Sequence, residues 1–292
     1  MIFPVFKFGG LWGLTVFNGL LMSLAFFFFF LSIKNFLLEK ILAIGLTIFL
    51  TWGVFSFGIR GQEMGFFFFS LLLWLLSKIR QNYAIAIFCP LITLFWANTH
   101  GGSVILGLIL MPFIFSSYLL NPLAKPKKIF FLTTVFLFSI FITFLNPFGL
   151  GIYQDSLRHF SGAHLDQLIA EWVPPPPFLW WLILLSGVGL SLMLIRTAKI
   201  QNFVLGILIL GFGFWALKAR RNLPFYLLLW FDLFFTLPIL KKSLSEWLKK
   251  DSLRNYLAFL TVIFFLFLGL LRLSNTLSTN LTFQNYCNQS SV

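Results

Sequence analysis

The sequence predicts an all-helical integral membrane protein, a polytopic bundle of about ten transmembrane helices with one long outer loop that carries an amphipathic helix. Hydrophobic residues make up 59% of the 292 residues and only 10% are charged, whereas soluble domains carry about 25% charged residues. The mean hydropathy is +0.94. No segment between the apolar runs is long enough to fold separately, so residues 1–292 are expected to form a single transmembrane domain.

Apolar runs bounded by charged residues, proline or glycine give the candidate spans. In chain order they cover residues 10–33, 41–58, 65–76, 83–97, 103–120, 129–145, 178–195, 203–217, 223–240 and 256–271. Most approach the length that a helix needs to cross a ~30 Å hydrocarbon layer. The third run is short, so we expect it to be extended by its neighbours, tilted or partly re-entrant.

The basic residues divide unequally between the two sides that alternate spans define. Fourteen of the 21 basic residues fall in one set of loops, at residues 34–40, 78–80, 125–128, 196–199 and 241–254. The positive-inside rule assigns that set to the cytoplasm. The net charge of +13 is therefore read as membrane topology, and no nucleic-acid partner is expected. We expect a bacterial plasma (inner) membrane protein whose active face is extracytoplasmic.

The segment of residues 146–177 is the one long outer loop, and residues 272–292 form an outer tail. The loop opens with Asn146-Pro147-Phe148-Gly149, which is typical of a turn that ends a helix. Residues 153–172 then have the pattern of an amphipathic helix lying along the membrane interface. Residues 174–177 are four prolines, which predict a stiff extended stub before the next span.

Unusual polar groups gather in the predicted outer loops. Arg60 and Gln62 end one hairpin, where an arginine can hold a phosphate in its fork of donors or, alternatively, snorkel to lipid headgroups. Arg220 and Arg221 stand on the outer side against the positive-inside trend. This favours an anionic partner such as a lipid pyrophosphate, with a headgroup anchor as the alternative. Asn222 follows them where the next helix begins and is also a candidate substrate-binding residue.

The outer tip at residues 95–102 joins two apolar runs. His100 in this tip can donate to a phosphate or act as a base, and the alternative is a histidine that caps the turn. Trp96 and Asn98 fit an aromatic belt and a helix-end cap, and Asn98 is also a candidate substrate-binding residue.

Acidic residues supply the other candidate catalytic groups. Glu171 lies close to the predicted membrane surface, where a carboxylate can bind a divalent metal ion or accept a proton from a sugar hydroxyl. Asp155 is a weaker candidate of the same kind, and both acids can instead be ordinary solvated loop residues. His159 and His164, with Asp155, match no strong zinc spacing. Asp232 lies mid-span, where an acid suggests function or pairing with a basic residue.

Six short motifs follow one another across most of the chain. They are Gly9-Gly10, Arg60-x-Gln62, Trp96-Ala97-Asn98-x-His100-Gly101-Gly102, Asn146-Pro147-Phe148-Gly149, Glu171-Trp172-x-Pro174 and Arg221-Asn222-x-Pro224. In this order they resemble bacterial polytopic membrane proteins of the GT-C glycosyltransferase superfamily, which are related to the dolichyl-phosphate-mannose–protein mannosyltransferases. The resemblance rests on the ordered set of motifs and not on any one of them.

The resemblance implies an extracytoplasmic active site, a polyprenyl-phosphate sugar donor and a glycan, lipid or protein acceptor, with membrane lipid around the bundle. Arg60, Arg220 and Arg221 would bind phosphate, His100 and Gln62 would orient the donor, and Glu171 would serve the acceptor. A divalent metal ion is left open as a cofactor. The family's first helix and acidic first outer loop have no counterpart here, and Arg60-Gly61-Gln62 replaces the frequent Arg-Pro-Gln. An N-terminally truncated, inactive form is therefore also an expectation.

Two other classes of function stay open. A transporter or flippase for a lipid-linked or anionic substrate would use the outer cations as a gate, but it needs polar residues through the bilayer midplane, and few are present. A non-catalytic membrane scaffold has no need to gather the outer polar groups. The hypothesis of an outer anion-binding site requires that four residues share one cavity, namely Arg60, His100, Glu171 and Arg221.

Overall fold

The computed structural model describes residues 2–33, 37–55, 62–79, 81–120, 125–160, 172–197, 199–235 and 237. Within these ranges the chain is helical and contains no strand, which confirms the predicted all-α class. The elements are α1 (Ile2–Ser32), α2 (Leu37–Phe55), α3 (Gln62–Lys78), the 3-10 helix η1 (Tyr83–Phe88), α4 (Cys89–Leu119), α5 (Pro126–Ile142), α6 (Gly151–Phe160), α8 (Pro177–Ile195), α9 (Ile200–Lys218), the 3-10 helix η2 (Arg220–Asn222) and α10 (Leu223–Phe234).

Four helical segments of the described chain are long and apolar enough to cross a membrane. They are Pro4–Ser32, Tyr83–Leu119, Pro177–Ile195 and Ile200–Lys218. This agrees with an integral membrane protein, although the predicted count of ten spans is not confirmed. The last predicted span, residues 256–271, lies outside the described residues. Of the predicted amphipathic helix, only the part within α6 is described, so the long outer loop is not confirmed as a whole.

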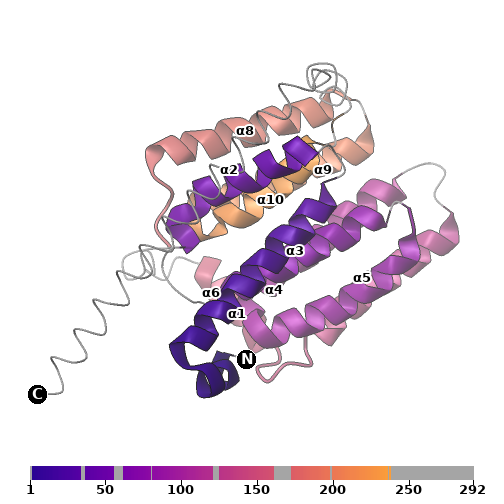
Figure 1. Cartoon of the computed structure of the whole chain (residues 1–292). Coiled ribbons are helices and arrows are strands. Elements are labelled where there is room, and N and C mark those ends of the chain that lie inside the picture. Colours follow the sequence, from indigo (N-terminus) through magenta and orange to yellow (C-terminus); the bar gives the residue numbers. More distant parts are fainter. Residues whose placement is uncertain are drawn as a thin grey trace, which may run out of the picture.

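The helices form two groups that pack against each other (Figure 1). One group contains α1, α3, α4 and α5, and the other contains α2, α8, α9 and α10. α4 packs on α9, and α10 packs on α3, so the two groups share one core. Helices in a lipid environment associate through close van der Waals packing, which small residues and aromatic rings both allow. The contacts between the two groups are of this kind, as α3 shows.

α3 lies at the centre of this core. It contacts α1, α4 and α10, and 12 of its 17 residues are buried. Its phenylalanines pack on rings from other helices: Phe69 lies 5.3 Å from Phe225 and 5.6 Å from Phe212, measured between ring centroids. The phenylalanine run of residues 66–69 therefore contributes packing surface to the core.

α4 reverses direction at the predicted tip. His100 has φ −149° and ψ 70°, outside the helical region, although helical residues precede and follow it. A Cβ added to Gly107 would lie 2.7 Å from Cζ3 of Trp96. These two residues are eleven positions apart, which is about 16 Å along a straight helix. The two halves of α4 therefore form a hairpin, as the two predicted runs and their polar tip require.

The two ends of the bundle differ in chemistry. At one end Lys40, at the start of α2, lies 4.3 Å from the ring centroid of Phe30 and within electrostatic range of Lys78. α3 runs from Gln62 to Lys78, a length of about 24 Å at 1.5 Å per residue. Gln62 and His100 meet at the opposite end, in the cavity described below. We call the end that holds Lys40 and Lys78 the lysine-rich end, and the polar tips gather at the opposite end.

Candidate anion-binding site at one end of the bundle

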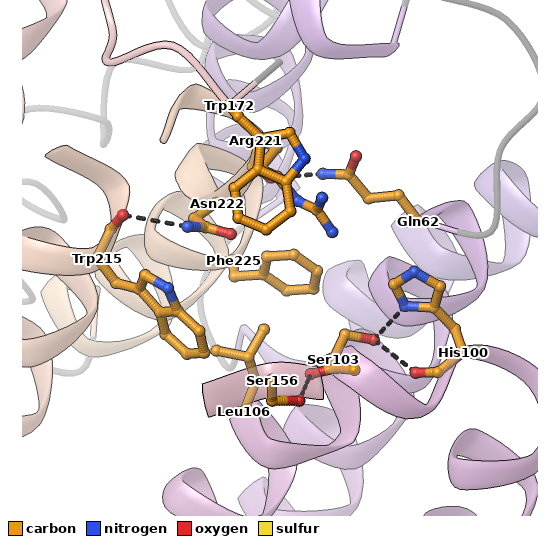
Figure 2. Close-up of a pocket in the computed structure, with 11 residues that line it drawn as sticks. Gln62, His100, Ser103, Leu106, Ser156, Trp172, Trp215, Arg221, Asn222 and Phe225 are labelled. Atoms are coloured by element: carbon orange, nitrogen blue, oxygen red, sulfur yellow. Dashed lines mark hydrogen bonds between the residues drawn. The ribbon is translucent and has the colours of Figure 1, made fainter. Parts of the chain in front are cut away.

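A cavity of about 230 Å³ opens at the end of the bundle that holds the polar tips. Figure 2 shows the side chains around it, which come from α3, the tip and second half of α4, α6, α9, η2, α10 and the segment before α8. Its lining consists of Gln62, His100, Gly102, Ser103, Leu106, Ser156, Trp172, Trp215, Arg221, Asn222 and Phe225. The lining thus combines aromatic and apolar side chains with hydroxyl, amide, imidazole and guanidinium groups.

The guanidinium of Arg221 lies over the ring of Trp172, with 4.2 Å between its Cζ atom and the ring centroid. This cation–π contact fixes the plane of the guanidinium and orients it toward the cavity (Figure 2). The backbone carbonyl of Arg221 also accepts a hydrogen bond of 2.5 Å from Nε2 of Gln62. Two segments far apart in the chain therefore hold the arginine from both its side chain and its backbone.

Local sequence explains why Arg221 stands at this position. α9 ends at Lys218, and Ala219 is extended. Pro224 then occupies the first turn of α10, where its missing N–H leaves no helical bond unmade. The side chain of Asn222 donates to the carbonyl of Trp215 at 3.1 Å and so satisfies the end of α9. The backbone N–H of Arg220 donates to Val173 at 3.0 Å.

His100 faces Arg221 from the opposite wall, held by a cluster inside the α4 hairpin. Its Nδ1 atom lies 2.6 Å from Oγ of Ser103, and this hydroxyl donates to the backbone carbonyl of His100 at 3.1 Å. Nε1 of Trp96 donates to the same Oγ at 2.7 Å. Trp96 is fully buried and stacks on Phe68, with 6.0 Å between ring centroids. The expectation that Trp96 belongs to an aromatic belt is therefore wrong.

Glycines allow the close packing on which this cluster depends. A Cβ at Gly65 would lie 2.6 Å from Oγ of Ser103 and 3.4 Å from Nδ1 of His100. A Cβ at Gly101 would lie 2.7 Å from a methyl group of Ile152 on α6. Side chains at these positions would therefore push α3 and α6 away from the hairpin tip.

The structure brings four of the predicted site residues together. Gln62, His100, Arg221 and Asn222 all line the cavity, although they come from three distant parts of the chain. Three of the predicted polar tips thus meet at one cavity, while the side of the membrane on which they lie stays a prediction. The roles assigned to these side chains stay predictions.

Other predicted residues lie elsewhere. The exposed side chain of Asn98 donates to the carbonyls of Leu94 at 2.9 Å and Leu145 at 3.1 Å, so it joins the hairpin tip to the end of α5 and does not line the cavity. Arg220 also stands outside the lining residues. Arg60 and Glu171 lie outside the described residues, and Asp155 lies on α6 in a position whose side chain is not described.

Several lining residues were not predicted as site residues. Ser103 directly follows the motif that ends in Gly101-Gly102, and Trp172 belongs to the motif Glu171-Trp172-x-Pro174. Trp215 and Phe225 carry no such signal, because each looks like one more aromatic residue in an apolar span. In the described part of the chain, no group of three or more His, Cys, Asp or Glu side chains is arranged to hold a metal ion.

No known family model, curated protein or solved structure matches this chain significantly. The fold and site thus describe a helical membrane protein with a cavity at one end, where a guanidinium and an imidazole face each other between aromatic walls.

Proposed function

We propose that this protein is a membrane glycosyltransferase of the GT-C type, which moves a sugar from a polyprenyl-phosphate donor to an extracytoplasmic acceptor. The supporting observation is that Arg221 and His100, from separate helices, line one cavity at the end of the bundle opposite the lysine-rich end. Such a site can receive an anionic head group whose lipid tail stays in the membrane. The positive-inside rule, applied to the basic residues of the whole sequence, supports an extracytoplasmic position for this end.

An inverting sugar transfer needs two kinds of group, a base for the acceptor hydroxyl and cations for the leaving phosphate. Arg221 supplies a planar set of N–H donors, and its stacking on Trp172 at 4.2 Å removes much of its rotational freedom. His100 supplies an imidazole on the opposite wall. Gln62 and Asn222 add amide groups beside the arginine, although each already donates one hydrogen bond to backbone.

The other predicted groups would extend the same site. Arg60 and Arg220 would add positive charge for the phosphate, and Glu171 would approach the acceptor, because it immediately precedes the cavity residue Trp172. Asp155 belongs to α6, whose Ser156 lines the cavity. The carboxylates of Glu171 and Asp155 are the candidate ligands for a divalent metal ion. Whether transfer requires such an ion is tested by adding a metal chelator to the assay.

Membrane lipid is the expected environment of the bundle. α5 illustrates this, because only three of its 17 residues are buried, and Phe130 and Phe141 are 76% and 61% exposed. Rings exposed to this extent on a helix suit hydrocarbon and not water. The acceptor, whether glycan, lipid or protein, would approach from the aqueous side of the cavity.

The proposal is tested with the purified protein in proteoliposomes and a panel of short-chain polyprenyl-phosphate hexoses and pentoses. Release of polyprenyl phosphate measures transfer, and binding of a short-chain polyprenyl phosphate measures affinity. Arg221→Ala removes a charge-assisted hydrogen bond of about 1.5–3 kcal/mol, so the affinity is expected to fall about 10- to 150-fold. Arg221→Lys keeps the charge, loses the planar fork and is expected to give an intermediate loss.

Lys218→Ala is the matched control, because it removes one positive charge three residues away. Lys218 is exposed, lies over the ring of Phe214 at 5.4 Å and does not line the cavity. Its affinity for polyprenyl phosphate should stay near that of the unmodified protein. Equal losses for Lys218→Ala and Arg221→Ala would mean that general surface charge binds the lipid, and the proposed site would be wrong.

The transporter alternative has less support in the part of the chain that the structure describes. Leu106 and Phe225 line the cavity, and Phe225 packs on Phe66 and Phe69, which are buried in the core of α3. An anion that left the cavity toward the lysine-rich end would have to pass these rings without a polar partner. Scrambling of a labelled polyprenyl-phosphate sugar between leaflets, without transfer, would favour transport instead.

A further inference from the structure

The oxygen Oγ of Ser103 makes three polar contacts at once. Nε1 of Trp96 donates to it at 2.7 Å, its own hydroxyl reaches the carbonyl of His100 at 3.1 Å, and Nδ1 of His100 lies 2.6 Å away. A serine hydroxyl has one proton to donate and two lone pairs that accept. The indole N–H can only donate, and the carbonyl can only accept.

Only one assignment of protons places a hydrogen in each of these contacts. The serine proton is used by the carbonyl of His100, and one lone pair is used by Trp96. The contact between Nδ1 and Oγ then has a hydrogen only if Nδ1 carries it. If Ser103 donated to Nδ1 instead, its oxygen would face the carbonyl oxygen at 3.1 Å with no hydrogen between them.

We infer that Ser103 positions His100 as the Nδ1–H tautomer, so that the neutral imidazole presents a bare Nε2 to the cavity. In Figure 2 this second ring nitrogen points away from Ser103, toward the side of the cavity that Gln62 and Arg221 occupy. A bare Nε2 accepts a hydrogen bond and repels phosphate oxygens. The cavity therefore has an anion-binding wall at Arg221 and a wall at His100 that takes a hydroxyl donor.

Packing keeps the cluster in this arrangement. Trp96 is fully buried, between Phe68 on one side and Gly107, where an added Cβ would meet the indole at 2.7 Å. Gly65 brings α3 against Ser103 so closely that a Cβ there would lie 2.6 Å from its Oγ. This packing restricts rotation of the serine, so its hydrogen bonds determine which nitrogen of His100 holds the proton.

On the proposed function, this assigns His100 to the acceptor and Arg221 to the leaving group. The acceptor oxygen forms the new bond to the anomeric carbon and its proton passes to Nε2. The bond between the anomeric carbon and the phosphate oxygen breaks, and the phosphate keeps the electron pair and faces Arg221. Ser103 is then a positioning residue, since it acts through His100.

The test is nitrogen NMR on the protein labelled with ¹⁵N-histidine in lipid nanodiscs, at a pH where His100 is neutral. The chain has three histidines, so the His100→Asn variant identifies the signals of His100 by their loss. A protonated Nδ1 and a bare Nε2 are expected. A bare Nδ1 with a protonated Nε2 would overturn the inference, and the protonation state itself is read on the unmodified protein.

Two serine variants separate positioning from mere packing. Ser103→Ala removes the acceptor of the Nδ1 proton, so the signals of His100 should shift toward a mixture of tautomers. Ser156→Ala is the matched control, because Ser156 also lines the cavity but donates to the carbonyls of Gly102 and Ile152, and it should leave the signals unchanged. An unchanged pattern in Ser103→Ala would show that Ser103 does not hold the tautomer.

Transfer assays extend the test to the reaction. Ser103→Ala is expected to lower kcat roughly 10²-fold, the lower end of the contribution of a general base, with little change in the KM for the donor. The NMR result needs no substrate, so the two ideas fail separately. A bare Nε2 in a protein that transfers no sugar removes the proposed function alone, and transfer activity with a bare Nδ1 removes this inference alone.

Discussion

Replacing Gly65 by alanine tests whether α3 packs directly against the polar cluster of the α4 hairpin. The added Cβ would lie 2.6 Å from Oγ and 3.2 Å from Cβ of Ser103, closer than packed atoms approach, so Ser103 has to move. Its movement breaks one or two hydrogen bonds of about 0.5–1.5 kcal/mol each, or strains the contact by about 1–3 kcal/mol. Alanine regains up to ~1 kcal/mol as the better helix former.

The net expectation for Gly65→Ala is a loss of about 1–2 kcal/mol in the free energy of unfolding. Gly211→Ala is the control, because Gly211 also lies in a helix, but nothing is within 4 Å of its added Cβ, so the helix-propensity gain of up to ~1 kcal/mol should stand alone. Thermal unfolding of both variants in one detergent should place their midpoints about 4–12 °C apart, with Gly65→Ala the lower.

A raised midpoint for Gly65→Ala, equal to that of Gly211→Ala, would refute the close approach of α3 to Ser103. The same variant also bears on the site. Since the displaced serine cannot keep its contact with Nδ1 of His100, the ¹⁵N signals of this histidine should change in Gly65→Ala and stay unchanged in Gly211→Ala.

Two further predictions concern the hairpin. Gly107→Ala would place a Cβ 2.7 Å from the indole of Trp96 and 3.0 Å from Leu72. It should therefore lower the free energy of unfolding by about 1–3 kcal/mol. A thermal unfolding midpoint equal to that of the unmodified protein would contradict the reversal of α4 at His100. Asn98→Ala removes the hydrogen bond to the carbonyl of Leu145 and should cost about 0.5–1.5 kcal/mol of stability. Its affinity for polyprenyl phosphate should not change, and a large loss of affinity would restore Asn98 to the site.

Much of the site could be found from the sequence, because polar residues are rare in this mostly apolar chain and are therefore easy to identify. His100, Arg221 and Gln62 were selected for this reason, and they do line one cavity. Their alternation along the chain assigns them to one side of a membrane, since consecutive spans reverse direction. This argument uses only local hydropathy and the spacing of charges.

The residues that the sequence could not assign are those whose role depends on the interior of the bundle. Trp96 looks like a typical interfacial tryptophan, but it is fully buried and donates to Ser103. Asn98 belongs to the same motif as His100, yet the hairpin turns its amide toward the end of α5. Asn98 and His100 are only two positions apart, yet His100 faces the cavity and Asn98 faces the end of α5. They differ because the turn at His100 breaks the helical periodicity.

The sequence by itself determined that this protein is a helical membrane protein and that its rare polar groups collect at the tips of its spans. Hydropathy and charge are local properties, and a lipid environment forces long apolar runs into helices. Only the tertiary structure decided which tips meet and which nitrogen of His100 faces the cavity. Those facts depend on contacts such as Gly65 with Ser103 and Gln62 with Arg221, which join residues far apart in the chain and leave no local pattern.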